Sequence, residues 1–181
     1  MRGYFGVGVE GISKEQNVGT IVRSAHSFGA EFFFAISPDV DIEALKVSDT
    51  SDAFDHMPYY QYDSAQALVL PERCQLVGVE FTEDAVPLPS FRHPIRAAYI
   101  FGPEMGSLSA PVIERCAHVV KIPMKFCVNV GVAAALVMYD RMICLGRHAE
   151  RPVTPGRPLL DYTPPAQVHR RKLRRKKGVR R

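Results

Sequence analysis

The sequence predicts a three-layer α/β domain with a mainly parallel sheet, followed by a basic tail. About five short apolar segments are typical of strands buried on both faces, and helical patterns alternate with them along the chain. After Gly146 the composition changes to proline and arginine, without an apolar face. We therefore expect one domain over residues 1–146 and a linker with a basic tail over residues 147–181.

The expected elements follow from apolar periodicity and from residues that begin or end helices. The strands are expected at residues 4–9, 32–36, 75–81, 97–101 and 118–122. The helices are expected at residues 18–28, near 65–70, from Ser109 onward and at 129–145. Residues 37–63 are polar and rich in turn-forming residues, so no element is assigned there.

Four residues mark the expected helix ends. Asn17 is a candidate cap for the first helix, in which Ile21, Val22, Ala25 and Phe28 form an apolar stripe, and Gly29 ends it. Ser109 is a candidate cap for the third helix, with Pro111 in the first turn, where proline is tolerated.

Composition argues against several classes of protein. Hydrophobic residues make up 46% and charged residues 23% of the 181, which favours a folded globule. The longest apolar stretch, residues 127–139, falls short of the roughly 18 residues that span a membrane, and no signal peptide is expected. The four cysteines form no CxxC pair and do not cluster with the six histidines, so neither a disulfide framework nor a metal site is expected. We expect a reduced, cytoplasmic protein.

Charge is divided unevenly along the chain. Residues 1–146 carry eleven Lys/Arg against seventeen Asp/Glu, a net charge of −6, whereas residues 147–181 carry +10. A basic tail favours a polyanionic partner, because each neutralised phosphate releases counterions; a tail that only aids solubility is the alternative. The expected RNA-binding residues are Arg170, Arg171, Lys172, Arg174, Arg175, Lys176 and Lys177.

A glycine-rich segment near the start matches the dinucleotide-binding pattern GxGxxG at Gly6, Gly8 and Gly11. That pattern functions when the glycines follow a strand and open a helix. Here they lie inside the first expected strand, and the helix begins later. A dinucleotide-dependent oxidoreductase is therefore a minor alternative, and we expect these glycines to allow close packing against a neighbouring backbone.

Arg23 lies in the middle of the first helix, among apolar residues. An arginine buried there would cost several kcal/mol unless it were paired. Arg23 is therefore expected to hold an anion, which is either a carboxylate of a structural ion pair or a substrate phosphate.

Two further segments run from a strand through a loop into a helix. Residues 99–109 break into a Gly/Pro/Gly loop that carries Glu104, and ligands of open α/β sheets bind where strands end. Residues 120–135 lead through a second loop into a helix rich in small residues, which allow close approach by a neighbour. On its own, Asn129 is an ordinary helix cap.

Together, in this order, the three segments resemble the SPOUT superfamily, specifically the SpoU (TrmH-like) RNA ribose 2′-O-methyltransferases. The patterns are N-x-G-x-I-x-R-S from Asn17 to Ser24, G-P-E…G…L-S from Gly102 to Ser109 and I-P-M…N-V-x-x-A-x-A from Ile122 to Ala135. The resemblance covers about residues 3–146. Two positions depart from it: Cys127 stands where the family often has serine, and Gly106 comes one place early.

The resemblance implies a C-terminal trefoil knot, S-adenosylmethionine (AdoMet) bound in that knot, and an active site formed across a homodimer. The cofactor-binding residues carried over by position are Val79, Glu80, Phe101, Gly102, Pro103, Ile122, Met124, Cys127, Val128 and Ala133. It also implies that Arg23 is the catalytic arginine, supplied by the partner subunit, with Asn17, Glu104 and Asn129 organising the site. Because a guanidinium stays protonated, we expect Arg23 to grip a phosphate and orient the ribose hydroxyl.

The implied substrate is RNA. The chain begins almost directly at the catalytic domain, as in short family members, which favours tRNA; rRNA is the alternative. A catalytically silent RNA-binding protein on the same fold is a further alternative, favoured by Cys127 and the shifted Gly106 and opposed by the retained Asn17, Arg23, Glu104 and Asn129.

Overall fold

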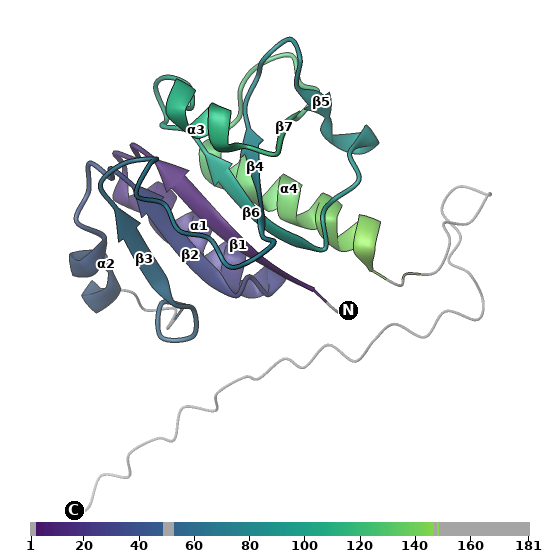
Figure 1. The fold of residues 1–181 in the computed structure, drawn as a ribbon. Helices are drawn as coiled ribbons and strands as arrows, with labels where there is room; N and C mark the ends of the chain where they lie inside the picture. Colours follow the sequence, from purple (N-terminus) through teal and green to yellow (C-terminus); the bar gives the residue numbers. More distant parts are fainter. Residues whose placement is uncertain (1–2, 49–52, 147, 149–181) are drawn as a thin grey trace, which may run out of the picture. The chain divides into compact units, whose positions relative to one another are not determined.

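A computed structural model describes residues 3–48, 53–146 and 148, which contain one seven-stranded sheet in the order β3-β2-β1-β6-β4-β7-β5 (Figure 1). All its strand pairs are parallel. The strands are β1 Tyr4–Glu10, β2 Phe32–Ile36, β3 Tyr59–Tyr62, β4 Gln75–Val79, β5 Val86–Pro87, β6 Arg96–Phe101 and β7 His118–Lys121. The helices are α1 Glu15–Phe28, α2 Ile42–Ser48, α3 Ala110–Arg115, α4 Val130–Leu145 and a 3₁₀ turn at Leu88–Ser90. The predicted α/β class with a parallel sheet is confirmed.

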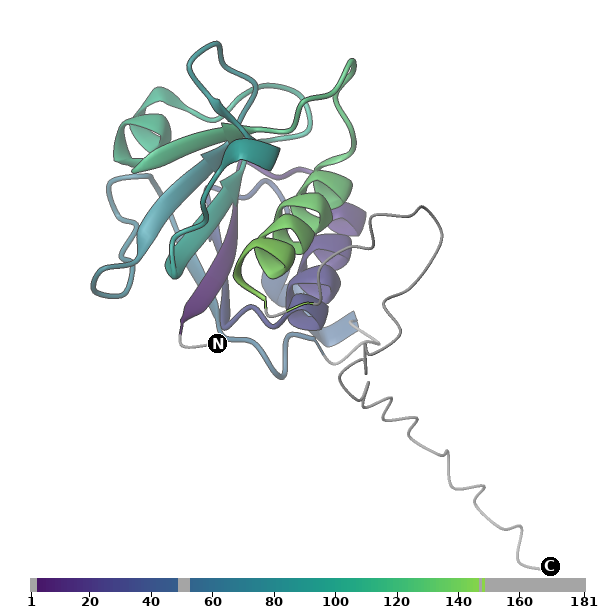
Figure 2. The ribbon, with the colours of Figure 1, turned by 90° about the vertical axis from the view of Figure 1, so that its right-hand side faces the viewer.

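Helices cover both faces of the sheet and produce three layers. Helices α1 and α4 lie side by side on one face (Figure 2), over a core that includes Val7, Tyr99 and Val137. Helix α3 covers the other face, where Val112 packs in a second core with Phe34 and Ile100. Among the described residues, none of the helices combines the length and apolar character needed to cross a membrane. The knot implied by the resemblance stays a prediction.

The five predicted strands are all present, and their ends differ from the prediction by at most two residues. Helix α2 and strand β3 lie within residues 37–63, for which the sequence predicts no element. Strand β3 is an edge strand of half-exposed tyrosines, without the apolar run that is typical of a central strand. The helix predicted near residues 65–70 is wrong. Arg115 instead donates hydrogen bonds to the carbonyl oxygens of Ala65, Gln66 and Leu68 and holds them in a turn.

The glycines of β1 make room for aromatic rings. Gly6 pairs with Phe32 and Gly8 with Phe34 in the register of β1 and β2. A Cβ atom at either glycine would overlap with the phenyl ring of its partner. The expected close neighbour was backbone, and the structure corrects it to two phenylalanine side chains that lean over β1. The GxGxxG pattern is thus explained by packing.

A buried polar cluster fixes α4 to the starts of β1 and β6. The Tyr99 hydroxyl lies 2.6 Å from Nδ1 of His93 and accepts a hydrogen bond from Arg141, and Nε2 of His93 lies 2.9 Å from Asp140. The Arg141 guanidinium also donates to the carbonyl oxygens of Tyr4, Pro94 and Ile95. Burial lowers the pKa of His93 despite the Asp140 carboxylate. This cluster holds α4, and with it the loop that precedes α4, in place.

Replacing Gly8 by alanine is expected to lower the free energy of unfolding by about 1–3 kcal/mol, because the added methyl group has no room beside the buried Phe34 ring. Gly19→Ala is the matched control: its added Cβ meets nothing within 4 Å, so the helix gains about 0.5–1 kcal/mol. Urea unfolding measures both variants. A Gly8→Ala variant as stable as the wild type would contradict this account.

Candidate functional site

The candidate site is a cleft of about 380 Å³ at the edge of the sheet where the parallel strands end. Its residues come from the ends of β4 and β6 and the segments that follow β4, β6 and β7, from the start of α4, and from Lys14, directly before α1. A smaller cavity of about 120 Å³ adjoins it and shares Val79, Glu80, Cys127, Val128 and Ala133 with it. Ligands of open α/β sheets bind at this edge.

The structure brings all ten predicted cofactor-binding residues to these two cavities. The main cleft is lined by Val79, Glu80, Phe101, Gly102, Pro103, Cys127, Val128 and Ala133. Ile122 and Met124 line the adjoining cavity. Three segments that are far apart in the sequence thus converge on one hollow.

Three of the four predicted catalytic residues form one hydrogen-bonded chain, of which Glu104 and Asn129 line the cleft and Asn17 is buried beside it. The side-chain amide of Asn17 donates to Oε1 of Glu104 at 2.6 Å, and its oxygen accepts from Asn129 at 2.9 Å. Oδ1 of Asn129 in turn accepts from the backbone N–H of Gly131 at 2.8 Å. This chain connects α1, the loop after β6 and the first turn of α4.

Asn17 does not cap α1, so that prediction is wrong. Helix α1 begins at Glu15, with Lys14 in the cap position, and Asn17 lies within its first turn with only 6% of its surface exposed. Its amide is used for the tertiary hydrogen bonds to Glu104 and Asn129. Asn129 is a cap, as its simplest interpretation held, and it also reaches Asn17.

Ser13 completes the surroundings of Glu104, and the sequence analysis did not identify it. Its backbone N–H and its hydroxyl both donate to Oε2 of Glu104, at 3.1 and 3.0 Å. Partial burial raises the pKa of Glu104, but the hydrogen bonds from Asn17 and Ser13 outweigh it, and the pKa lies below its ordinary value of 4.5. Glu104 is therefore ionised at neutral pH.

Two more carboxylates hold the loop over residues 102–109. Glu80, directly after β4, accepts from the backbone N–H of Leu108 at 2.8 Å. Glu10, the last residue of β1, accepts from the backbone N–H and the hydroxyl of Ser109, at 2.8 and 2.6 Å. Ser109 occupies the cap position of α3, but its hydroxyl serves Glu10 and makes no capping bond. The sequence analysis did not identify Glu10. Its position as an acidic residue at the end of a central strand was the feature that could have pointed to it.

Arg23 lies apart from the hydrogen-bonded chain. Its predicted place among buried apolar residues is wrong: the buried stripe of α1 consists of Val18, Ile21, Val22 and Ala25, and Arg23 is on the exposed side. Among the described residues its side chain has no ion pair, and it does not line the cleft. Within the described part of the chain, Arg23 therefore does not form the structural ion pair that was one of its two expected roles. The basic residues 170–177 lie outside the described residues.

Replacing Asn17 by alanine is expected to lower the free energy of unfolding by about 2 kcal/mol at pH 7, because Glu104 and Asn129 each lose a partner. A carboxylate with a lowered pKa contributes stability above its unfolded pKa, which is lost as the pH falls through the folded pKa. The deficit of Asn17→Ala should therefore shrink below about pH 4.5.

Gln16→Ala is the control for this prediction, because Gln16 is the exposed neighbour on the same helix turn. Chemical unfolding from pH 3 to 7 measures all three proteins. An equal loss in both variants, or a loss at Asn17 that does not change with pH, would contradict the assigned bonding.

Comparison with known proteins identifies a family that matches this chain. A model of the SpoU rRNA Methylase family matches residues 5–139. A search of curated protein sequences finds no match.

Solved structures of low sequence identity share the fold. An rRNA methyltransferase from Sinorhizobium meliloti superposes with a TM-score of 0.68 at 17% identity, over 78% of this chain and 56% of that one. The SpoU methyltransferase AviRb from Streptomyces viridochromogenes, in complex with the cofactor AdoMet, gives 0.67 at 22% identity, over 79% and 61%. A structure on the 2-OH methylation of C/U34 on tRNA gives 0.68 at 22% identity, over 80% and 92%.

The chain thus spans less than two thirds of the Sinorhizobium and AviRb chains. At these identities the structural likeness establishes the shared α/β fold, and the family match covers the segments that build the cleft. This chain belongs to the SpoU rRNA methylase family.

Proposed function

We propose that this protein transfers a methyl group from AdoMet to a ribose 2′-hydroxyl of RNA. The observation that carries the proposal is the convergence of ten residues from three distant segments on the cleft and its adjoining cavity, with the Glu104–Asn17–Asn129 chain beside the cleft. Two relatives support it: AviRb is known in complex with AdoMet, and another structure concerns 2-OH methylation of tRNA.

The lining of the cleft fits AdoMet. Val79, Phe101, Val128 and Ala133 provide apolar surface suited to an adenine ring, and Lys14 and Glu104 provide charged groups suited to the amino-acid part. Gly102 allows a close approach of the chain, because a Cβ there would lie 3.1 Å from the backbone nitrogen of Leu108, which is a tight contact. When bound, AdoMet supplies an electrophilic methyl carbon.

The protein's part in the reaction is to position the hydroxyl and to manage its proton. A ribose hydroxyl is a weak nucleophile at neutral pH and must lie in line with the methyl carbon. Arg23 keeps its proton, so we assign it to grip the neighbouring phosphate bidentately and orient the hydroxyl. A phosphate oxygen or a water molecule takes the proton, and Asn17, Glu104 and Asn129 keep the wall of the site in shape.

We further propose that Arg23 acts in the cleft of a second subunit. Its exposed position, away from the cleft of its own chain, supports this assignment. An exposed apolar stripe along α4 supports a homodimer, because burial of such a stripe against a second copy is favourable. The stripe consists of Val132, Leu136, Tyr139, Met142 and Ile143, which are 36–48% exposed.

The proposed substrate is tRNA, and rRNA is the second candidate. The likeness to the structure on tRNA methylation supports the first, and the Sinorhizobium rRNA methyltransferase and the family's description support the second. The basic residues 170–177 are proposed to add phosphate contacts that do not depend on sequence.

Arg23→Ala is expected to lower the rate of labelled-methyl transfer from AdoMet to RNA by about 100-fold or more, because a misoriented hydroxyl loses in-line geometry. Arg23→Lys keeps the charge but loses the bidentate grip, so it should recover only a small part of the rate. Both variants should bind AdoMet as the wild type does. Bulk tRNA and rRNA are offered separately. Wild-type rates in both variants would contradict the role of Arg23.

A further inference from the structure

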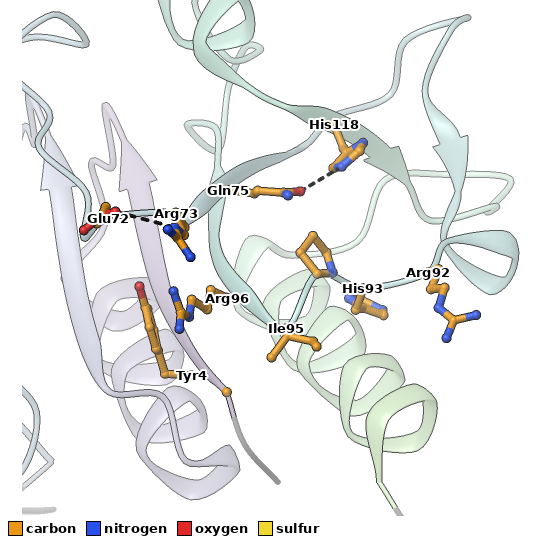
Figure 3. Close-up of a pocket in the computed structure, with 11 residues that line it drawn as sticks. Tyr4, Glu72, Arg73, Gln75, Arg92, His93, Ile95, Arg96 and His118 are labelled. Atoms are coloured by element: carbon orange, nitrogen blue, oxygen red, sulfur yellow. Dashed lines mark hydrogen bonds and ion pairs between the residues drawn. The ribbon is translucent and has the colours of Figure 1, made fainter.

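A second hollow of about 920 Å³ lies at the opposite edge of the sheet, where the parallel strands begin (Figure 3). Tyr4, Arg96, Gln75 and His118 line it, and they are the first residues of β1, β6, β4 and β7. These strands are neighbours in that order, so the four side chains follow one another along the edge. We call this hollow the basic groove.

Positive charge is concentrated in the basic groove. Arg73, Arg92 and Arg96 line it, and among the described residues Glu72 is the only acidic one in its lining. Residues 1–146 carry eleven Lys/Arg and a net charge of −6, so three of the eleven cations gather in one hollow of an acidic body. Such a hollow raises the local concentration of anions.

The charges of the groove are not neutralised within the described residues. Glu72 lies 3.5 Å from Arg73, but both side chains are more than three quarters exposed, so this pair contributes little. Arg92 and Arg96 are exposed and have no ion pair among the residues that the structure describes. Bringing like charges together costs free energy, which a bound anion would offset.

Arg73 is held in a conformation that is uncommon for its residue type. Its φ of 64° lies in the left-handed region, in a turn closed by the hydrogen bond from the backbone N–H of Cys74 to the carbonyl of Pro71. Figure 3 shows its side chain beside those of Tyr4 and Arg96. The turn fixes the backbone of Arg73, and the side chains of Arg73 and Arg96 both line the groove.

The chemistry of the lining suits nucleic-acid phosphates. Arginine forks bind phosphate bidentately, and tyrosine, glutamine and histidine side chains contact sugars and bases. The groove and the cleft lie at opposite ends of β6, whose six residues extend about 20 Å at roughly 3.3 Å each. At about 3.4 Å per phosphate, some six nucleotides of a stacked strand cover that distance. Because the basic tail has the same sign of charge as the groove, an anionic partner suits the groove better than the tail does.

We propose that the basic groove binds backbone phosphates of the RNA substrate, as a second contact remote from the cleft. This inference rests on the proposed function, since it takes RNA as the substrate. The groove would anchor the flank of the RNA while the cleft acts on one nucleotide. An acidic protein partner is the competing occupant, and the test below separates the two.

The test is binding of bulk tRNA and of rRNA to the full chain over a series of salt concentrations. The triple variant Arg73→Gln/Arg92→Gln/Arg96→Gln is expected to bind RNA roughly 10–100-fold more weakly at low salt. The slope of log K against log salt should become shallower by about 2–3, at roughly 0.7–0.9 for each of the three lost phosphate contacts. AdoMet binding should be unchanged, and the KM for RNA should rise more than kcat falls.

A matched pair of single variants controls for net charge, because each of the two changes it by −1. Arg96→Gln acts in the groove, whereas Gln61→Glu acts on the exposed edge strand β3 and can still accept the hydrogen bond from Tyr59. Only Arg96→Gln should weaken RNA binding and flatten the salt slope. If both variants weaken it equally, the effect is one of net charge and the groove proposal fails.

The outcomes also separate this proposal from the proposed function. If the wild type binds and methylates RNA and the triple variant binds it with equal affinity and slope, the groove serves another partner and this proposal alone fails. If the wild type binds no RNA, both proposals fail together. If the triple variant also loses AdoMet binding, the single variant Arg92→Gln decides, because that exposed side chain has no ion pair to lose among the described residues.

Discussion

The side-chain amide of Asn17 donates a hydrogen bond to Glu104 and accepts one from Asn129, and the shape of the cleft depends on that pair of contacts. The partners lie 87 and 112 residues away along the chain. A buried amide left without partners costs free energy, so the network favours the arrangement in which all three segments meet. The same residue holds an ionised carboxylate at the rim and the first turn of α4, which is why one small side chain affects the whole wall.

The parallel sheet gives the domain two chemically different ends. At the carboxyl ends of the strands, Glu10, Glu80 and Glu104 hold backbone N–H groups and side chains around a partly apolar cleft. At the amino ends, Arg73, Arg92 and Arg96 line a groove that the first residues of four strands also line. Because every strand runs the same way, a group at the start of a strand is separated from the cleft by the length of that strand. A large polyanion can contact both ends, whereas a small substrate cannot.

The sequence allowed much of the fold to be predicted, because central parallel strands are apolar on both faces. The 32–36 run became a fully buried strand, and Gly29 ends α1 in the left-handed conformation expected of a helix-ending glycine. Strand β3 was not predicted, because an edge strand is polar enough to resemble a turn. The ten cleft residues were predicted through a family resemblance and were found together, although their binding role remains a proposal.

Other features depend on tertiary contacts that no local pattern reports. Asparagine is a residue type that often caps helices. Only the burial of Asn17 beside Glu104 shows that its amide makes a tertiary hydrogen bond in place of a cap. Arg23 lies in a helix with many apolar residues, yet its position on the helix places it on the exposed side. The basic groove could not be predicted from the sequence, because its arginines come from separate segments. These segments come together only when the strands pair in the sheet.

The most direct test of the central claim is the chemical identity of the product. Labelled methyl from AdoMet is transferred to RNA by the full chain, and the RNA is digested to nucleosides, which are then separated. We expect the label in nucleosides methylated on the 2′-oxygen of the ribose. Label on a base, or RNA without label despite saturable AdoMet binding, would contradict it.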